Sequence, residues 1–354
     1  MGILIRYFTI WLFVCCCLES CYAKQKSIDS SKKAAIVIRA NTGETVYSEN
    51  PDAKRYPASL TKMMTLLLLF EAIEKRKVTL GTKFKVSALA TRQQPSKLEL
   101  RVGERIPVRA LISALAVKSA NDVAVVVAEG LSGSVSSFCK LMNNKCRELG
   151  MKNSHFVNPS GLPDQRQIST ARDMAKLGIT LYKRFPKYWQ FLSQKFFCYK
   201  NVTHKTHCKI LQWYKGADGA KTGYIAASGF NLFVTAKRDG DRVFVVVMGR
   251  STAKLRDFYA AHLMDIYLKK CAKKMNTLSP SRFTVTRNMK AARKDLSAQI
   301  GKSEMIEQVV HADDEIPVSE IIKSIKLSPS ELDNLYKDEE VINEEDEILA
   351  SKVR

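Results

Sequence analysis

Apolar residues recur with a helical period in the first half of the chain and alternate with polar residues from Phe196 onward. The helical pattern predicts helices over residues 60–74, 107–117, 121–129, 135–149 and 170–184. The first of these is apolar nearly all round, which is typical of a helix in the middle of a core. Thr170 can cap the last helix, with Asp173 reaching back to it.

Alternation predicts strands near both ends of this helical stretch. A hairpin is expected over residues 34–48, with its turn at Asn41-Thr-Gly43. Later strands are expected over residues 196–200, 220–225, 230–236 and 242–248, followed by an amphipathic helix over 253–274. Asp239-Gly-Asp241 makes the last two strands antiparallel. This order predicts an α+β fold, an antiparallel sheet flanked by helices with an inserted all-helical region.

The N-terminus has the pattern of an export signal. Arg6 precedes an apolar run over residues 8–18, and Cys21-Tyr22-Ala23 places small residues where a signal peptidase cleaves. We therefore expect residues 1–23 to be a signal peptide and the protein to act in the periplasm or cell envelope. The run is short for a membrane span, although its retention as an anchor, or lipidation at Cys21, stays open.

Charge is unevenly distributed along the chain. Residues 281–354 hold 11 Lys and Arg against 16 Asp and Glu, while the whole chain has a net charge of +22. We expect residues 24–276 to form one catalytic domain and residues 277–354 to be an acidic, poorly ordered tail. Nucleic acid is not expected as a partner of an exported basic domain. An anionic partner fits the basic domain better, either lipid, which would imply peripheral membrane association, or cell-wall polymer. Alternatively, these cations are simply solvated and have no partner.

Cysteine usage leaves two interpretations open. Cys198 and Cys208 can bridge a hairpin in an oxidising compartment, or they can be free thiols. His204, His207 and Cys208 are close in sequence, but no second pair of ligands completes a zinc site. The sequence therefore predicts no metal.

Three short motifs follow one another along the chain: Ser59-Leu-Thr-Lys62, Ser119-Ala-Asn121 and Lys221-Thr-Gly223. Their residue types and order are those of serine acyltransferases that act on D-amino-acid peptides. Each alone is weak evidence, since Ser-x-x-Lys also occurs at Ser30/Lys33, Ser137/Lys140 and Ser251/Lys254. Lys-Thr-Gly occurs once, and the ordered set makes the prediction.

Ser59 is the candidate nucleophile and Lys62 its base. Residues three apart lie on one face of a helix, so the amine can reach the hydroxyl. Lys62 must be neutral to accept a proton, which requires apolar surroundings and a second cation, for which Lys221 is the candidate. The alternative is a helix-capping serine beside a surface lysine.

The other two motifs supply the remaining groups. Ser119 is expected to present its hydroxyl to Lys62 and relay a proton to the leaving amine, and Asn121 to donate its amide to a substrate carbonyl. Ser and Asn at this break can instead be helix caps.

Lys221 and Thr222 suit a substrate carboxylate, and Gly223 allows a peptide to approach closely. The backbone N–H groups of Ser59 and Tyr224 are candidates for the oxyanion site.

With these motifs the chain resembles the serine D-alanyl-D-alanine carboxypeptidases, the low-molecular-mass penicillin-binding proteins. Further similarity lies in Tyr56-Pro-Ala-Ser, Asn158-Pro-Ser-Gly-Leu-Pro, Thr170-Ala-Arg-Asp-Met and Ser228-Gly-Phe-Asn-Leu, and it covers roughly residues 30–275. The resemblance implies a Ser59 acyl-enzyme that removes the terminal D-alanine from peptidoglycan stem peptides. It also implies acylation by β-lactam antibiotics and no cofactor. The acidic end of the chain departs from the amphipathic membrane anchor of many members.

Three alternatives share these motifs. An endopeptidase would cut D-alanyl cross-links, and an inactive wall-binding module would keep the fold without the chemistry. A class A β-lactamase needs a glutamate that activates the deacylating water. Between Asn121 and Lys221 the only glutamates are Glu129 and Glu148, and neither lies in the pattern that enzyme requires.

Overall fold

A five-stranded antiparallel sheet organises the part of the chain that the computed structural model describes, residues 33–269. Its strands run in the order β2 (Thr45–Glu49), β1 (Ala34–Arg39), β9 (Asp241–Arg250), β8 (Gly229–Arg238) and β7 (Ala217–Ile225). β1 and β2 form the predicted hairpin, and Arg238 pairs with Asp241 across the predicted turn between β8 and β9. β7 is an edge strand of this sheet.

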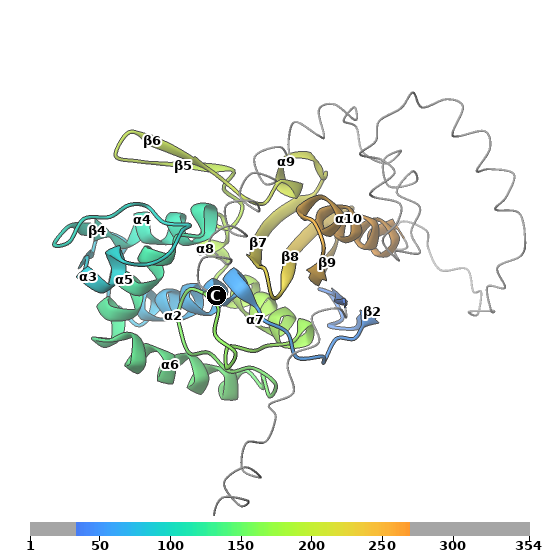
Figure 1. Cartoon of the computed structure of the whole chain (residues 1–354). Helices are drawn as coiled ribbons and strands as arrows, with labels where there is room; N and C mark the ends of the chain where they lie inside the picture. The colour runs from blue at the N-terminus through green and yellow to red at the C-terminus, as the bar shows by residue number, and fades with distance from the viewer. Residues whose placement is uncertain (1–32, 270–354) are drawn as a thin grey trace, which may run out of the picture.

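The two faces of the sheet support two cores. Alternate residues such as Ile36, Phe244 and Val246 pack with the helical region, while Val37 and Val245 pack beneath α10 (Ala253–Lys269) and α9 (Ile210–Trp213). Figure 1 shows the helices on one side of the sheet and α10 on the other. The α+β prediction is confirmed.

The helical region surrounds α2 (Lys62–Glu74), in which every residue from Lys62 to Ala72 is buried. The one-turn helix η1 (Ala58–Thr61) leads into it. The other helices of the described chain here are α3 (Ala88–Thr91), α4 (Val108–Ser113), η2 (Ala114–Lys118), α5 (Asn121–Ser132), α6 (Val135–Glu148), α7 (Ala171–Arg184) and α8 (Pro186–Trp189). The position predicted for the helix 60–74 is therefore confirmed, with a tighter first turn.

Two short hairpins lie outside the main sheet. β3 (Lys83–Lys85) pairs with β4 (Arg105–Pro107), and β5 (Phe196–Tyr199) pairs with β6 (Val202–Lys205). The strand expected from Phe196 thus exists but does not extend the sheet, and Figure 1 shows its hairpin projecting over the helical region. The Tyr199 hydroxyl donates to Glu104, 2.5 Å away, which links this hairpin to the residue before β4.

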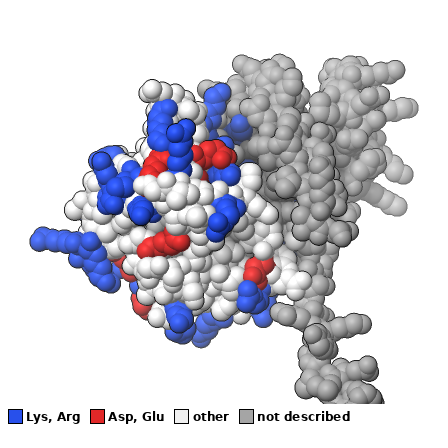
Figure 2. Space-filling view, turned by 60° about the vertical axis from the view of Figure 1, so that its left-hand side comes forward, with Lys and Arg blue, Asp and Glu red and all other residues white. Residues whose placement is uncertain are grey.

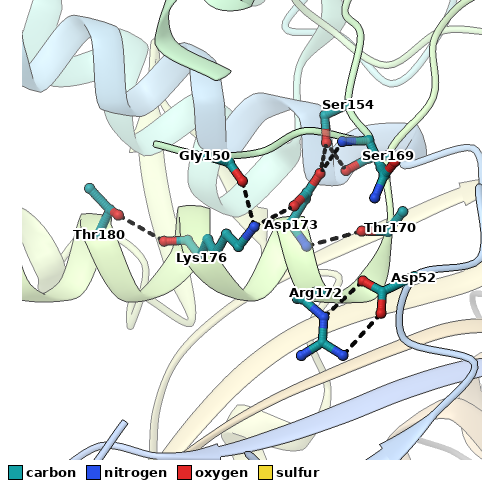
Figure 3. A network of polar contacts seen from close by, with 10 residues as sticks. Asp52, Gly150, Ser154, Ser169, Thr170, Arg172, Asp173, Lys176 and Thr180 are labelled. Carbon is teal, nitrogen blue, oxygen red and sulfur yellow. Dashed lines mark hydrogen bonds and ion pairs between the residues drawn. The ribbon is translucent and has the colours of Figure 1, made fainter. Parts of the chain in front are cut away.

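The start of α7 is held by a polar network (Figure 3). The Thr170 hydroxyl caps the helix by accepting from the Asp173 N–H at 3.1 Å, as predicted. The Asp173 carboxylate, however, does not complete the expected reciprocal contact. It accepts instead from the Asn153 N–H and the Ser154 hydroxyl, both at 2.9 Å, which joins α7 to the segment before it.

Other predictions concern the ends and the surface of the chain. The signal peptide, the tail 277–354 and the end of the predicted helix 253–274 lie outside the described residues.

Within residues 33–269 no single helix is long and apolar enough to cross a membrane, and α5 and α6 meet that criterion only together, with an 85° bend between them. Lys and Arg outnumber Asp and Glu in this range by 39 to 17, and Figure 2 shows the excess on one face.

Candidate active site

Ser59 lies in η1, at the entrance to the central helix α2. Two glycines pack closely against this turn. A Cβ added to Gly161 would lie 1.9 Å from the Ala58 carbonyl oxygen, and one added to Gly223 would lie 3.0 Å from the Ser59 nitrogen. The nucleophile turn is therefore held between the loop that contains Gly161 and the strand β7.

The Lys62 amine has three partners and no solvent exposure. Its Nζ lies 2.8 Å from Ser59 Oγ, 2.7 Å from Asn121 Oδ1 and 2.6 Å from the Ser160 carbonyl oxygen. The contact between Ser59 and Lys62 is the one that their spacing predicted.

These partners orient the amine toward Ser59. A carbonyl oxygen and an amide oxygen can only accept hydrogen bonds, so Ser160 and Asn121 take two N–H groups from Lys62. A neutral amine has two N–H groups and one lone pair, and that lone pair is left facing the Ser59 hydroxyl. The arrangement suits a base that takes the proton of Ser59.

Both lysines of the site are buried, and burial lowers the pKa of each. The pKa of Lys62 lies well below its usual range, because burial disfavours the ammonium and the charge of Lys221 repels it, with Asp122 opposing the shift. Burial lowers the pKa of Lys221 to about 7, an effect that Cys208 opposes and Arg256 adds to. The lowered pKa of Lys62 favours the neutral amine that a base requires.

The hydrogen-bond partner of Ser119 differs from the one predicted. Helix α4 continues into the π-helical turn η2, and Ser119 follows in the left-handed conformation with φ of 59°. Its hydroxyl accepts a hydrogen bond from Lys221 Nζ at 2.9 Å, whereas the contacts of Lys62 are with Ser59, Asn121 and Ser160. The expected direct contact with Lys62 is therefore replaced by one with Lys221.

Asn121 also differs from its prediction. Its Nδ2 donates to the Gln94 and Pro95 carbonyl oxygens at 2.9 and 3.0 Å, which fixes the amide with Oδ1 toward Lys62. Both amide hydrogens are thus occupied in this structure. Asn121 holds Lys62 and the segment after α3, and a substrate carbonyl would have to displace one of these bonds.

The third motif lies along β7, and its Gly223 packs closely against the nucleophile turn. Lys221 Nζ donates to Ser119 and to the Thr222 carbonyl oxygen, and Thr222 is 8% exposed. Tyr224 is half-buried, with its ring centroid 4.3 Å from that of Phe230. Because β7 is an edge strand, a peptide can lie extended beside it.

The loop 158–161 holds groups to which the sequence assigned no role. The Ser160 carbonyl binds Lys62, and the Pro159 carbonyl accepts from the Thr65 hydroxyl at 2.7 Å. Backbone carbonyls carry no sequence signature. The only available signal was the resemblance of Asn158-Pro-Ser-Gly-Leu-Pro to a family landmark.

The serines of the other Ser-x-x-Lys sequences do not belong to this site, and the cysteine and histidine candidates form neither a disulfide nor a metal site in the described chain. Ser137 is exposed on α6 beside Ser134, and Ser251 is exposed before α10, while Ser30 lies outside the described residues. In the part of the chain that the structure describes, no disulfide joins Cys198 to Cys208, which agrees with the second of the two interpretations. Among residues 33–269 no group of three His, Cys, Asp or Glu side chains is arranged to hold a metal ion.

Comparison with known proteins gives one consistent family. A family model described as D-alanyl-D-alanine carboxypeptidase matches residues 21–252. The D-alanyl-D-alanine carboxypeptidase DacF of Bacillus subtilis is 34% identical over 260 residues, which cover 70% of this chain. The chain spans 66% of the length of that relative.

Solved structures show the same fold. Penicillin-binding protein 5 of Haemophilus influenzae matches with a TM-score of 0.64 and 31% identity, over 67% of this chain and 70% of that one. Penicillin-binding protein D2 of Listeria monocytogenes, in its ampicillin-bound form, matches with a TM-score of 0.61 and 31% identity, over 67% and 96% of the two chains. The motifs, the fold and these matches agree: the chain belongs to the D-alanyl-D-alanine carboxypeptidase family.

Proposed function

We propose that the protein is a serine D-alanyl-D-alanine carboxypeptidase that removes the terminal D-alanine from peptidoglycan pentapeptide stems. The observation that carries this proposal is the Lys62 amine, buried and oriented by Asn121 and Ser160 toward Ser59 Oγ. Such a pair activates a serine for acyl transfer without a histidine.

In the proposed reaction Lys62 takes the proton of Ser59 as Oγ attacks the carbonyl carbon of the penultimate D-alanine. The backbone N–H groups of Ser59 and Tyr224 stabilise the oxyanion. Ser119 passes its hydroxyl proton to the leaving amine as the peptide bond breaks and takes the proton held by Lys62 in its place. This relay requires Ser119 to turn from Lys221 toward Lys62 when substrate is bound, and it leaves Lys62 neutral again. Terminal D-alanine departs, and water then hydrolyses the Ser59 ester to release the shortened stem.

The substrate is recognised through its free carboxylate. Lys221 donates one N–H group to Ser119 and one to the Thr222 carbonyl oxygen. Its ammonium form has a third N–H group, which can be donated to the substrate. With the Thr222 hydroxyl it can bind a C-terminal carboxylate, and Gly223 lets the peptide approach β7. Binding the carboxylate places the scissile carbonyl over Ser59.

β-Lactams are proposed as inhibitors, because the Listeria relative was solved with ampicillin bound. They would form a long-lived ester at Ser59.

We also propose that residues 1–23 direct export to the periplasm or cell envelope. In that compartment the basic surface in Figure 2 would face anionic polymer or lipid.

Two substrates test the proposal against an endopeptidase. Lys221→Ala should greatly lower kcat/KM on a peptide that ends in free D-Ala-D-Ala. On the same peptide with an amidated terminus the variant should lose much less, since the wild-type protein gains little from Lys221 there. Equal losses on acid and amide would assign Lys221 to nucleophile protonation and remove the main support for the carboxypeptidase. A wild-type protein that cleaves neither peptide would favour the inactive module.

A further inference from the structure

The loop that reaches Lys62 is closed at its base by side chains. The hydroxyls of Ser154 and Ser169 lie 2.8 Å apart, and His155 pairs with Ile168 as an antiparallel bridge. Asp173, at the start of α7, accepts from the Ser154 hydroxyl (Figure 3). Both ends of the loop are therefore fixed to the same helix.

Asn158 shapes the tip of this loop. Its Oδ1 accepts from the Gly161 N–H at 2.7 Å and the Ser160 N–H at 3.2 Å, and its Nδ2 donates to the Leu162 carbonyl oxygen at 3.0 Å. These bonds form a compact turn from which the Pro159 and Ser160 carbonyls face α2.

Gln167 connects this turn to the nucleophile turn. The side chain is 2% exposed, and its Oε1 accepts from the Val157 and Asn158 N–H groups at 2.8 and 3.0 Å. Its Nε2 donates to Thr61 Oγ1 at 3.1 Å and to Asn158 Oδ1 at 3.2 Å. Thr61 is the residue immediately before Lys62.

We infer that Gln167 is a positioning residue for the acylation step, because it fixes the Ser160 carbonyl relative to Lys62 by linking the loop to Thr61. The inference rests on the proposed function and extends it to a residue in neither the three motifs nor the set of groups that touch substrate. Gln167 contacts neither Ser59 nor Lys62 through any hydrogen bond of the described chain, so its effect passes through Thr61 and the loop.

The chemistry explains why this position matters. Ser160 and Asn121 take the two N–H groups of neutral Lys62 and leave its lone pair for Ser59. If the Ser160 carbonyl moves away, one N–H is free to rotate toward Ser59, and the lone pair no longer faces the proton it must accept. A displacement of 1 Å near a reacting group can cost about 10²-fold in rate.

The chain provides a matched control in Asn143. This amide on α6 makes the same kind of bonds to the same segment, donating to the Phe156 carbonyl oxygen at 2.8 Å and accepting from its N–H at 2.9 Å. It contacts neither Thr61 nor the turn 158–161 in the described hydrogen bonds. Loss of this amide should destabilise the loop without misplacing Ser160.

The experiment compares Gln167→Met with Asn143→Leu, two near-isosteric changes that remove a buried amide. The rate of Ser59 acylation by a fluorescent penicillin is measured against pH, beside a thermal melt. We expect a loss of about 10- to 100-fold for Gln167→Met and less than about 3-fold for Asn143→Leu. In Gln167→Met the rise of the acylation rate with pH should occur at lower pH. Losing the Ser160 carbonyl as a hydrogen-bond acceptor makes the ammonium form of Lys62 less favourable and so lowers its pKa.

Thr61 gives a second route to the same answer if Gln167→Met does not fold. Thr61→Val removes the acceptor of Gln167 Nε2 and should slow acylation in the same direction, while Thr61→Ser should restore it. Equal small losses for Gln167→Met and Asn143→Leu, with the limb of the profile unmoved, would show a purely structural glutamine. A wild-type protein that penicillin does not label would instead refute the proposed function, and the inference with it.

Discussion

At the scale of single residues, the site depends on two lysines that share one buried space. Burial disfavours the ammonium form of both, and the positive charge of Lys221 further disfavours that of Lys62. Lys221 keeps contact with a hydroxyl and a carbonyl, which can support its charge, while Lys62 faces Ser59. The division of roles between base and cation follows from these contacts.

Lys62→Arg should nearly eliminate acylation of Ser59 although the positive charge is kept. Arginine does not lose its proton in proteins, so it cannot act as the base. A general base contributes typically about 10²- to 10⁴-fold, and the acylation rate by penicillin should fall by that order. Survival within a few-fold, in a variant whose melt shows it folded, would make Lys62 a structural cation only.

Lys221 should also make stability depend on pH. Its pKa of about 7 in the folded protein lies below its ordinary value of 10.5, so between these values the unfolded chain binds a proton that the folded chain has lost. The free energy of unfolding should therefore rise with pH across this window, and the contribution should be lost as the pH falls to 7. Urea unfolding of Lys221→Met at several pH values should show a smaller rise.

The control for that measurement is Lys237→Met, which removes an exposed lysine from the neighbouring strand β8. It should follow the wild-type pH dependence. If Lys221→Met follows it as well, the folded protein does not lose the proton of Lys221 in this range.

Local geometry determined which residue roles could be predicted from the sequence. Ser59 and Lys62 are three residues apart on one helical turn, so their contact follows from spacing alone. The partner of Ser119 depends on a π-helical turn, on a left-handed residue and on the strand that lies opposite, which no spacing encodes. The role of Gln167 depends on a loop closed by contacts between distant residues.

At the scale of elements, the nucleophile turn depends on two close backbone approaches. Gly161→Ala should both destabilise the protein and slow acylation, because φ of +91° and a Cβ 1.9 Å from the Ala58 carbonyl oxygen allow no fit. Gly150→Ala is the matched control, with φ of +63° and open space around its Cβ. It should incur only the strain of the left-handed backbone, about 1 to 2 kcal/mol.

Acylation rates and melting temperatures of the two variants decide this prediction. The Gly161 variant should lose acylation activity well beyond its loss of stability, whereas the Gly150 variant should keep the wild-type rate. Equal rates in both would show that the turn around Ser59 tolerates displacement.

Elements with a strong local pattern were predicted correctly, whereas the pairing of the strand β5 was not. The apolar run of α2 and the turn at Asp239-Gly-Asp241 fixed a helix and a strand pair. The strand β5 was predicted from its alternation, yet among the described strands it pairs only with β6, which was not expected. Pairing between strands depends on distant contacts such as Tyr199 with Glu104, which alternation does not report.

At the scale of the whole molecule, the described domain should not need the acidic region that follows it. A chain ending at Thr277 is expected to fold and to bind penicillin like the full chain, because residues 277–354 are rich in acidic residues and poor in aromatic ones. Thermal melts and labelling of both chains test this. An insoluble or unlabelled shortened chain would show that the acidic region contributes to the domain.

The central claim is that Ser59, activated by Lys62, forms the covalent intermediate. The most direct measurement is incubation with a fluorescent penicillin, followed by mass mapping of the labelled peptide. The account predicts one ester on Ser59 and no label on Ser59→Ala, with the melting temperature of the variant close to that of the wild-type protein. Label that persists in Ser59→Ala, or that maps to Ser30, Ser137 or Ser251, would contradict it.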